Sequence, residues 1–142
     1  MTNTLDELFD KISKEKLNCA QKMMACSLEL RGRSNPELVH SLFGLGGGLQ
    51  TQSVCGTLSG GCCALSSYYD PEDGAPDDDL RARHRQMIQT FVRWFEEEYG
   101  SQLCRDLIGD DMSKKISFCP GLIRASFEKC LVILDENGFD YE

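Results

Sequence analysis

Apolar residues recur at intervals of three and four positions along most of this chain, a spacing typical of amphipathic helices. The first such stretch runs from Thr4 to about Arg31, and its opening residues match a helix-capping pattern. Asn35 and Pro36 predict the start of a short second helix, because asparagine caps well and proline suits the first helical position. The amino-terminal part of the chain is therefore expected to form two helices.

Further helices are expected in the rest of the chain, each bounded by capping residues or glycine. They are predicted near Ser53–Tyr69, Asp78–Tyr99 and Ser101–Leu107, and from Cys119 and Pro120 to Asn137. No segment alternates apolar and polar residues with the period of two that indicates a strand. The expected fold is all-α: a single domain over residues 1–142, built as a bundle of five or six helices.

Charge and hydropathy exclude several classes of protein. The 142 residues include 23 acidic and 15 basic ones, for a net charge of −8. Such a balance argues against a nucleic-acid-binding protein, which needs a basic surface. No apolar run approaches the roughly 18 residues of a membrane-spanning helix, so no membrane insertion is expected. No secretory signal is visible in the first ten residues, so a cytoplasmic protein with reduced thiols is expected.

The stretch from residue 41 to residue 69 contains no charged residue and seven glycines. It lacks the Gly-Lys-Ser/Thr ending of a phosphate-binding loop, and no strand precedes it. Glycine allows the backbone to approach a ligand closely, so Gly46, Gly47, Gly48 and Gly56 are candidate cofactor-binding positions. A purely structural bend explains the same glycines equally well.

Eight cysteines stand out in a chain of this length. Cys55, Cys104 and Cys119 fall at the predicted starts of helices, where unpaired N–H groups and the helix dipole stabilise a thiolate. A thiolate is both a nucleophile and a metal ligand. Burial as small apolar residues is the alternative for any of the eight.

No Cys-x-x-Cys motif is present, so a metal or redox site would have to be assembled from distant segments. Facing helices of a bundle can bring such segments together in its core. The widely spaced cysteines that such a site would use are Cys19, Cys55, Cys104 and Cys119.

Several short motifs together resemble the C_GCAxxG_C_C family of redox-active proteins. They are Asn18-Cys19-Ala20, Gly46-Gly47-Gly48, Cys55-Gly56-Thr57-Leu58-Ser59-Gly60-Gly61, Cys104-Arg105 and Cys119. The resemblance implies a small, helical, prokaryotic protein with four functional cysteines, often encoded beside transporter genes. Thr57 stands where the family pattern has alanine, a small change.

The same resemblance sorts the eight cysteines into two groups of four. It assigns the functional role to Cys19, Cys55, Cys104 and Cys119, and leaves packing roles to Cys26, Cys62, Cys63 and Cys130. A related domain occurs in split-Soret cytochromes, for which an iron–sulfur site has been proposed. This chain has no Cys-x-x-Cys-His motif, so the haem of those cytochromes is not expected here.

Three functions remain open on the sequence. The first is a cysteine-ligated metal centre, expected to be an iron–sulfur cluster for electron transfer or sensing, with N–H groups from the glycine-rich stretch facing its sulfurs. The second is metal-free thiol–disulfide chemistry with Cys55 and Cys119 as nucleophiles. The third is a non-redox module with structural zinc or a small ligand.

The expected partners are an unidentified electron donor or acceptor, a functional link to a transporter, and a second copy of the chain in a homodimer. The two histidines contribute little to these hypotheses. His84 lies among Arg81, Arg83 and Arg85 and is expected on a solvated helix face, and His40 precedes an apolar run. No nucleophile motif accompanies either one.

Overall fold

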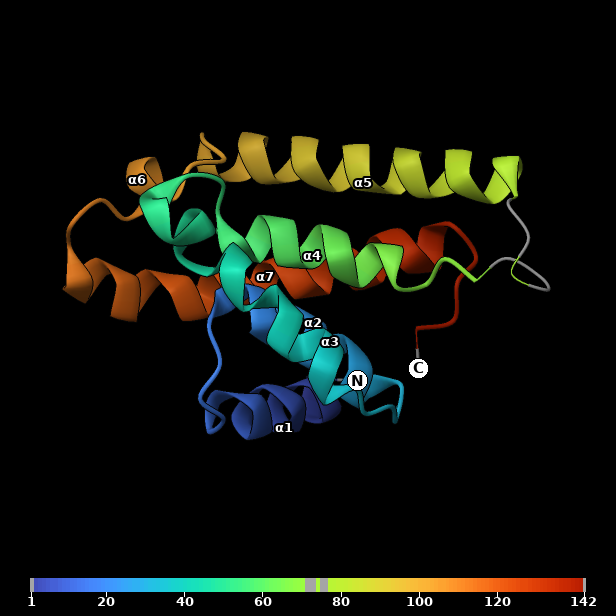
Figure 1. Cartoon of the computed structure of the whole chain (residues 1–142), viewed down its shortest axis with the longest axis horizontal. Helices are drawn as coiled ribbons and strands as arrows, with labels where there is room; N and C mark the ends of the chain where they lie inside the picture. The colour runs from blue at the N-terminus through green and yellow to red at the C-terminus, as the bar shows by residue number, and fades with distance from the viewer. Residues whose placement is uncertain (1, 71–73, 75–76, 142) are drawn as a thin grey trace.

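Helices make up the computed structural model, which describes residues 2–70, 74 and 77–141 (Figure 1). Its α-helices are α1 (Thr2–Ser13), α2 (Cys19–Leu30), α3 (Pro36–Ser41), α4 (Gly56–Ser66), α5 (Asp78–Tyr99), α6 (Cys104–Leu107) and α7 (Met112–Glu136). A 3-10 turn, η1 (Leu42–Leu45), and a π-type turn, η2 (Gly48–Gln52), connect α3 to α4. Within the described residues there is no strand, and no helix has the length and apolar character needed to cross a membrane.

The all-α prediction is confirmed, but the described part contains seven α-helices rather than five or six. One reason is that the helix predicted over Thr4–Arg31 is broken between Ser13 and Cys19. Asn18 starts the second piece with a capping box: its Oδ1 accepts from the Gln21 N–H (3.1 Å), and Gln21 Oε1 accepts from the Asn18 N–H (3.1 Å). This reciprocal cap satisfies the N–H groups of Asn18 and Gln21 at the start of the new helix.

The last helix begins earlier than the sequence predicts. Asp111 caps α7 by accepting from the N–H groups of Ser113 and Lys114, so the residues between Asp111 and Cys119, which the sequence leaves outside the predicted helix, are helical. Pro120 therefore lies inside α7, where it lacks the N–H that would bond to the Ile116 carbonyl. The predicted position of Cys119 at a helix start is wrong.

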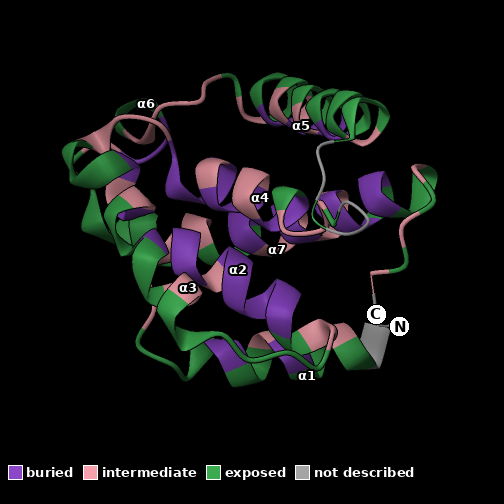
Figure 2. Cartoon of the chain, turned by 45° about the vertical axis from the view of Figure 1, so that its right-hand side comes forward, coloured by how far each residue is buried: buried purple, intermediate pink, exposed green. Residues whose placement is uncertain are grey.

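Helix α4 lies at the centre of the bundle and packs against α2, α5 and α7. Its glycines permit this close approach. A Cβ at Gly60 would lie 2.7 Å from the Ala20 backbone of α2, and one at Gly61 would lie 2.6 Å from the Phe91 ring of α5. The core around it includes Phe91, Phe95 and Phe127. Figure 2 shows buried residues gathered on α2, α4 and α7, while the outer face of α5 is exposed.

Candidate functional site

Four helices each bring one cysteine to the end of the bundle at which α4 begins, at the left of Figure 1. Cys19 is the first residue of α2, Cys55 directly precedes α4, Cys104 is the first residue of α6, and Cys119 lies within α7. The sulfurs are close enough to interact electrostatically, since the other three all raise the pKa of Cys119. The structure thus brings together the four positions that the resemblance selects.

A short backbone pairing holds two of these cysteines beside each other. The Cys55 N–H donates to the Gln102 carbonyl (2.8 Å), and the Cys104 N–H donates to the Ser53 carbonyl (2.8 Å). These two bonds flank an isolated antiparallel bridge between Val54 and Leu103. The segment before α4 and the segment before α6 are therefore fixed in register, although they are about fifty residues apart in sequence.

Glycines make room for two of the cysteines and for the residue that caps α2. A Cβ at Gly56 would lie 2.5 Å from Cys19 Sγ, and one at Gly48 would lie 2.9 Å from the Cβ of Cys104. A Cβ at Gly46 would overlap the side chain of Asn18, the cap of α2. At three of the four predicted cofactor-binding glycines, these contacts explain why no side chain is present: a Cβ there would overlap a neighbouring group.

The turn η2 beside Cys104 holds non-glycine residues in an unfavourable conformation. Leu49, Gln50 and Gln52 have positive φ angles of 58°, 61° and 58°. Each costs about 1 kcal/mol or more relative to an ordinary backbone conformation. Two bonds at Gln52 oppose this cost: its Nε2 donates to the Gly109 carbonyl (2.5 Å), and its own carbonyl accepts from Arg105 Nε (3.2 Å). Strained backbone held in this way is typical of functional sites.

The surroundings of the thiols favour their protonated forms. Burial raises the pKa of Cys55, while the N–H groups of Leu58 and Thr57 lower it in part. Burial and then the neighbouring Cys19 raise the pKa of Cys104. Burial, reinforced by the other three thiols, raises the pKa of Cys119 to about 11. Cys55, Cys104 and Cys119 are therefore neutral thiols near pH 7, and a bound cation would favour their ionisation.

The sulfurs are neighbours and do not form a finished coordination sphere. Among the described residues, no three side chains of Cys, His, Asp or Glu are arranged to hold a metal ion. A cysteine sulfur moves between staggered positions when the side chain rotates about its Cα–Cβ bond. Ligation by this cluster therefore requires the sulfurs to move from the positions they hold here, and rotation of the cysteine side chains is one such movement.

The remaining four cysteines pack in or against the apolar core, with Cys62 and Cys63 only half-buried. Cys26 and Cys130 are buried, and burial raises the pKa of Cys26 to about 12 and that of Cys130 well above its usual value. Burial also raises the pKa of Cys62, to about 12, and that of Cys63. None of these four thiols affects the pKa of Cys119, whereas the other three cluster thiols do. They are therefore separate from the cluster.

Two features of the structure, one at the cluster and one away from it, escaped the sequence interpretation. Asn18 both caps α2 and donates from Nδ2 to the Phe43 carbonyl (2.9 Å), which ties the start of α2 to η1. The asparagine followed three residues later by Gln21 was the available signal, since this spacing is typical of a capping box. His84 is the second feature: it is buried, so the expected solvated position is wrong. Its helix face was misjudged because arginines flank it.

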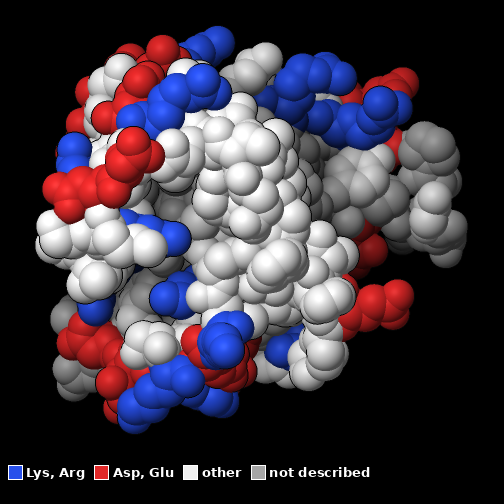
Figure 3. All heavy atoms as spheres, turned by 60° about the vertical axis from the view of Figure 1, so that its left-hand side comes forward, with Lys and Arg blue, Asp and Glu red and all other residues white. Residues whose placement is uncertain are grey.

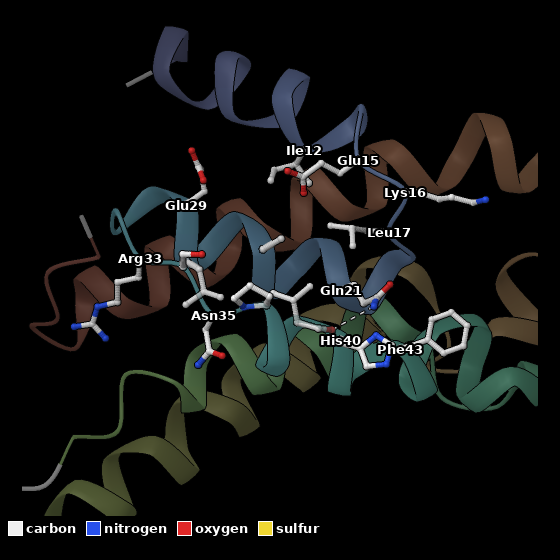
Figure 4. Close-up of a pocket in the computed structure, with 15 residues that line it drawn as sticks. Ile12, Glu15, Lys16, Leu17, Gln21, Glu29, Arg33, Asn35, His40 and Phe43 are labelled. Atoms are coloured by element: carbon white, nitrogen blue, oxygen red, sulfur yellow. Dashed lines mark hydrogen bonds between the residues drawn. The ribbon is translucent and has the colours of Figure 1, made fainter.

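A separate cavity of about 490 Å³ lies between α2, α3 and the segment after α1 (Figure 4). Gln21 spans part of it and donates to the Val39 carbonyl (3.3 Å). Its rim carries both signs of charge, with Glu15 and Glu29 as well as Lys16 and Arg33. None of the eight cysteines lines this cavity. It is therefore a different feature from the thiol cluster.

The fold and the cluster together define an all-α protein with four clustered thiols supplied by four helices. A family profile described as "Putative redox-active protein (C_GCAxxG_C_C)" matches residues 17–133. The chain belongs to this family. No curated protein and no solved structure gives a significant match to it.

Proposed function

We propose that the chain holds an iron–sulfur cluster and uses it in electron transfer or redox sensing. The ligands would be the four thiols that meet at the end of the bundle where α4 begins: Cys19, Cys55, Cys104 and Cys119. The observation that carries this proposal is their convergence, because one thiol arrives from each of four separate segments. Packing alone does not require such a meeting of sulfurs, and the family description supports redox chemistry.

The residues present suit such a group. Four thiolates are the usual donor set of an iron–sulfur cluster. The N–H groups of Thr57 and Leu58 favour negative charge on the Cys55 sulfur, as they would for a metal-bound thiolate. Gly48 and Gly56 leave space beside two other cysteines. When bound, a cluster would take up and release single electrons.

The chain itself would supply three things to this centre. Its helices would position the thiols, and their partial burial would limit the access of water. The positive charge of Lys115 would favour the thiolate forms, since it lowers the pKa of both Cys104 and Cys119. Loading would release the thiol protons to solvent.

The test is metal and sulfide analysis of protein purified without oxygen and then reconstituted with ferrous iron and sulfide. We expect a visible absorbance band and stoichiometric iron and sulfide in the wild type. Serine at any of the four cluster positions should lower both. Cys62→Ser and Cys63→Ser are matched controls, because these cysteines lie outside the cluster, and both should load normally.

A colourless wild-type protein with substoichiometric iron after reconstitution would refute the proposal. Stoichiometric zinc in its place would indicate a structural zinc site. The measurement thus separates the iron–sulfur proposal from the zinc module.

Metal-free thiol–disulfide exchange is a second candidate, with Cys55 and Cys119 as nucleophiles. The observation that favours it is the pair of N–H groups of Thr57 and Leu58, which lower the pKa of Cys55 in part although burial raises it overall. Selective alkylation of Cys55 or Cys119 at pH 6 would support this candidate. Absence of selective labelling at both would refute it.

A further inference from the structure

His84 is a buried histidine whose ring nitrogens are poorly paired, since within the described residues the nearby Tyr68 carbonyl affects its pKa but makes no hydrogen bond of normal geometry with it. Its exposed fraction is 5%, and its ring packs between Tyr69 (ring centroids 5.5 Å apart) and Phe139 (5.2 Å). Within the described residues, neither Nδ1 nor Nε2 makes a hydrogen bond of normal geometry. An unpaired buried polar group costs about 1–3 kcal/mol, so most such groups have a partner. The orphaned ring therefore needs an explanation.

The ring lines a hollow of about 780 Å³ between the end of α4 and the first turns of α5. This volume is in the range of small-molecule binding sites. Tyr69 forms one wall, and Ile88 contributes an apolar surface on α5. The hollow lies near the end of α4, whereas the thiol cluster lies at its start. It is therefore a separate site.

Two arginines give the hollow a positive rim. Arg81 and Arg85 are one helical turn apart on α5 and both line it. They are exposed, and no ion pair to either is present in the part of the chain that the structure describes. Figure 3 shows basic side chains gathered at the start of α5, at its upper right. Asp78 and Asp79 begin the same helix but do not line the hollow.

The histidine is suited to hydrogen bonding as a neutral ring. Burial, followed by the charge of Arg83, lowers the pKa of His84, although the nearby Tyr68 carbonyl opposes this shift. A neutral imidazole offers one N–H donor and one acceptor nitrogen. A ligand in the hollow could meet either atom.

We propose that this hollow binds a small organic anion. Its phosphate or carboxylate group would be bound by Arg81 and Arg85, because paired guanidinium groups match the geometry of such oxyanions. Its apolar or aromatic body would lie against Tyr69 and Ile88. A hydrogen bond to His84 would satisfy the ring nitrogen that the fold leaves unpaired.

The test uses the imidazole signals of the folded protein in NMR spectra. The chain has only two histidines, so His40→Gln assigns the signals of His84 directly. Phenyl phosphate is the probe, and inorganic phosphate and phenol represent its two halves. We expect a saturable shift of the His84 signals with phenyl phosphate, a weaker response to inorganic phosphate, and none to phenol.

Variants test the rim without disturbing the core. Arg81→Gln combined with Arg85→Gln should weaken phenyl phosphate binding about tenfold or more, since two charged hydrogen-bonding groups are lost. Arg93→Gln removes a charge from an exposed position further along α5 and should leave binding unchanged.

Three results would overturn the proposal. They are unmoved His84 signals, equal binding by the double-arginine variant, and equal affinity for inorganic and phenyl phosphate. Because the His40→Gln and arginine variants leave the buried ring in place, the test does not depend on a core substitution that could unfold the protein.

Discussion

The Cys19 sulfur lies directly over the backbone of Gly56, so that a Cβ at position 56 would be 2.5 Å from it. The two residues are far apart in the sequence, and they meet because α2 packs against α4. The absence of a side chain at Gly56 is therefore part of the thiol cluster. Under the proposed function, it is also a condition for ligation.

Gly56→Ala should displace the Cys19 thiol and reduce cluster loading. We expect iron and sulfide contents below half of wild type after identical reconstitution. The cost in folding free energy should be about 1–3 kcal/mol, as for other insertions into a packed interior. Metal analysis and urea unfolding of the metal-free protein measure the two effects separately.

Gly60→Ala is the matched control for this substitution. Its new Cβ would lie 2.7 Å from the Ala20 backbone, and its three nearest atoms all belong to Ala20 rather than to a cysteine. It should lower the free energy of unfolding by a similar amount while the folded protein still loads iron. Equal loss of iron in both variants would mean that Gly56 acts through stability alone.

Asn18→Ala should destabilise the start of α2. It removes the acceptor of the Gln21 N–H and the donor to the Phe43 carbonyl. Loss of the cap alone costs about 1 kcal/mol, so a total above this value is expected. Asn18→Ser keeps a capping oxygen but is too short to reach Phe43, and it should lie between alanine and wild type in urea unfolding. Equal stability of all three proteins would contradict the capping role.

Cys26 should make stability depend on pH in the alkaline range. Burial raises its folded-state pKa to about 12 from 9.0, so between these values the unfolded chain binds fewer protons than the folded one. The contribution of the protonated Cys26 thiol to the free energy of unfolding is complete below pH 9. It is lost as pH rises toward 12, by up to about 1.4 kcal/mol per pH unit. The difference in unfolding free energy between wild type and Cys26→Ala should shrink accordingly. A constant difference from pH 8 to about 10.5 would contradict the assignment.

Pro120→Ala should stabilise α7. Alanine restores the N–H that can bond to the Ile116 carbonyl, and Pro120 is exposed, so little packing is lost. We expect the free energy of unfolding to rise by about 1–3 kcal/mol. Gly121→Ala is a useful comparison because its Cβ meets nothing within 4 Å, and it should add about 1 kcal/mol through helix propensity alone. A destabilised Pro120→Ala would show that the proline ring has a packing role.

Local signals in the sequence predict much of this fold. The apolar spacing of the segment Asp78–Tyr99 predicts α5 with its observed bounds, since capping and glycine signals mark both ends. The same reasoning fails at Cys119, because proline usually opens a helix and here the Asp111 cap had already begun one. It also fails at Asn18, where the apolar spacing predicts one continuous helix. The chain breaks between Ser13 and Cys19, and the capping box at Asn18 is the local signal of that break.

What the sequence determined by itself is the helical class, the net negative charge and the family, because periodicity, charge and short motifs can be read directly from the chain. Only the tertiary structure decided which side chains meet. The pairing of Val54 with Leu103 places Cys55 beside Cys104, and the packing of α4 on α2 places Cys19 over Gly56. The burial of His84 is of the same kind. Such contacts depend on the crossing of helices distant in sequence, which no local pattern encodes.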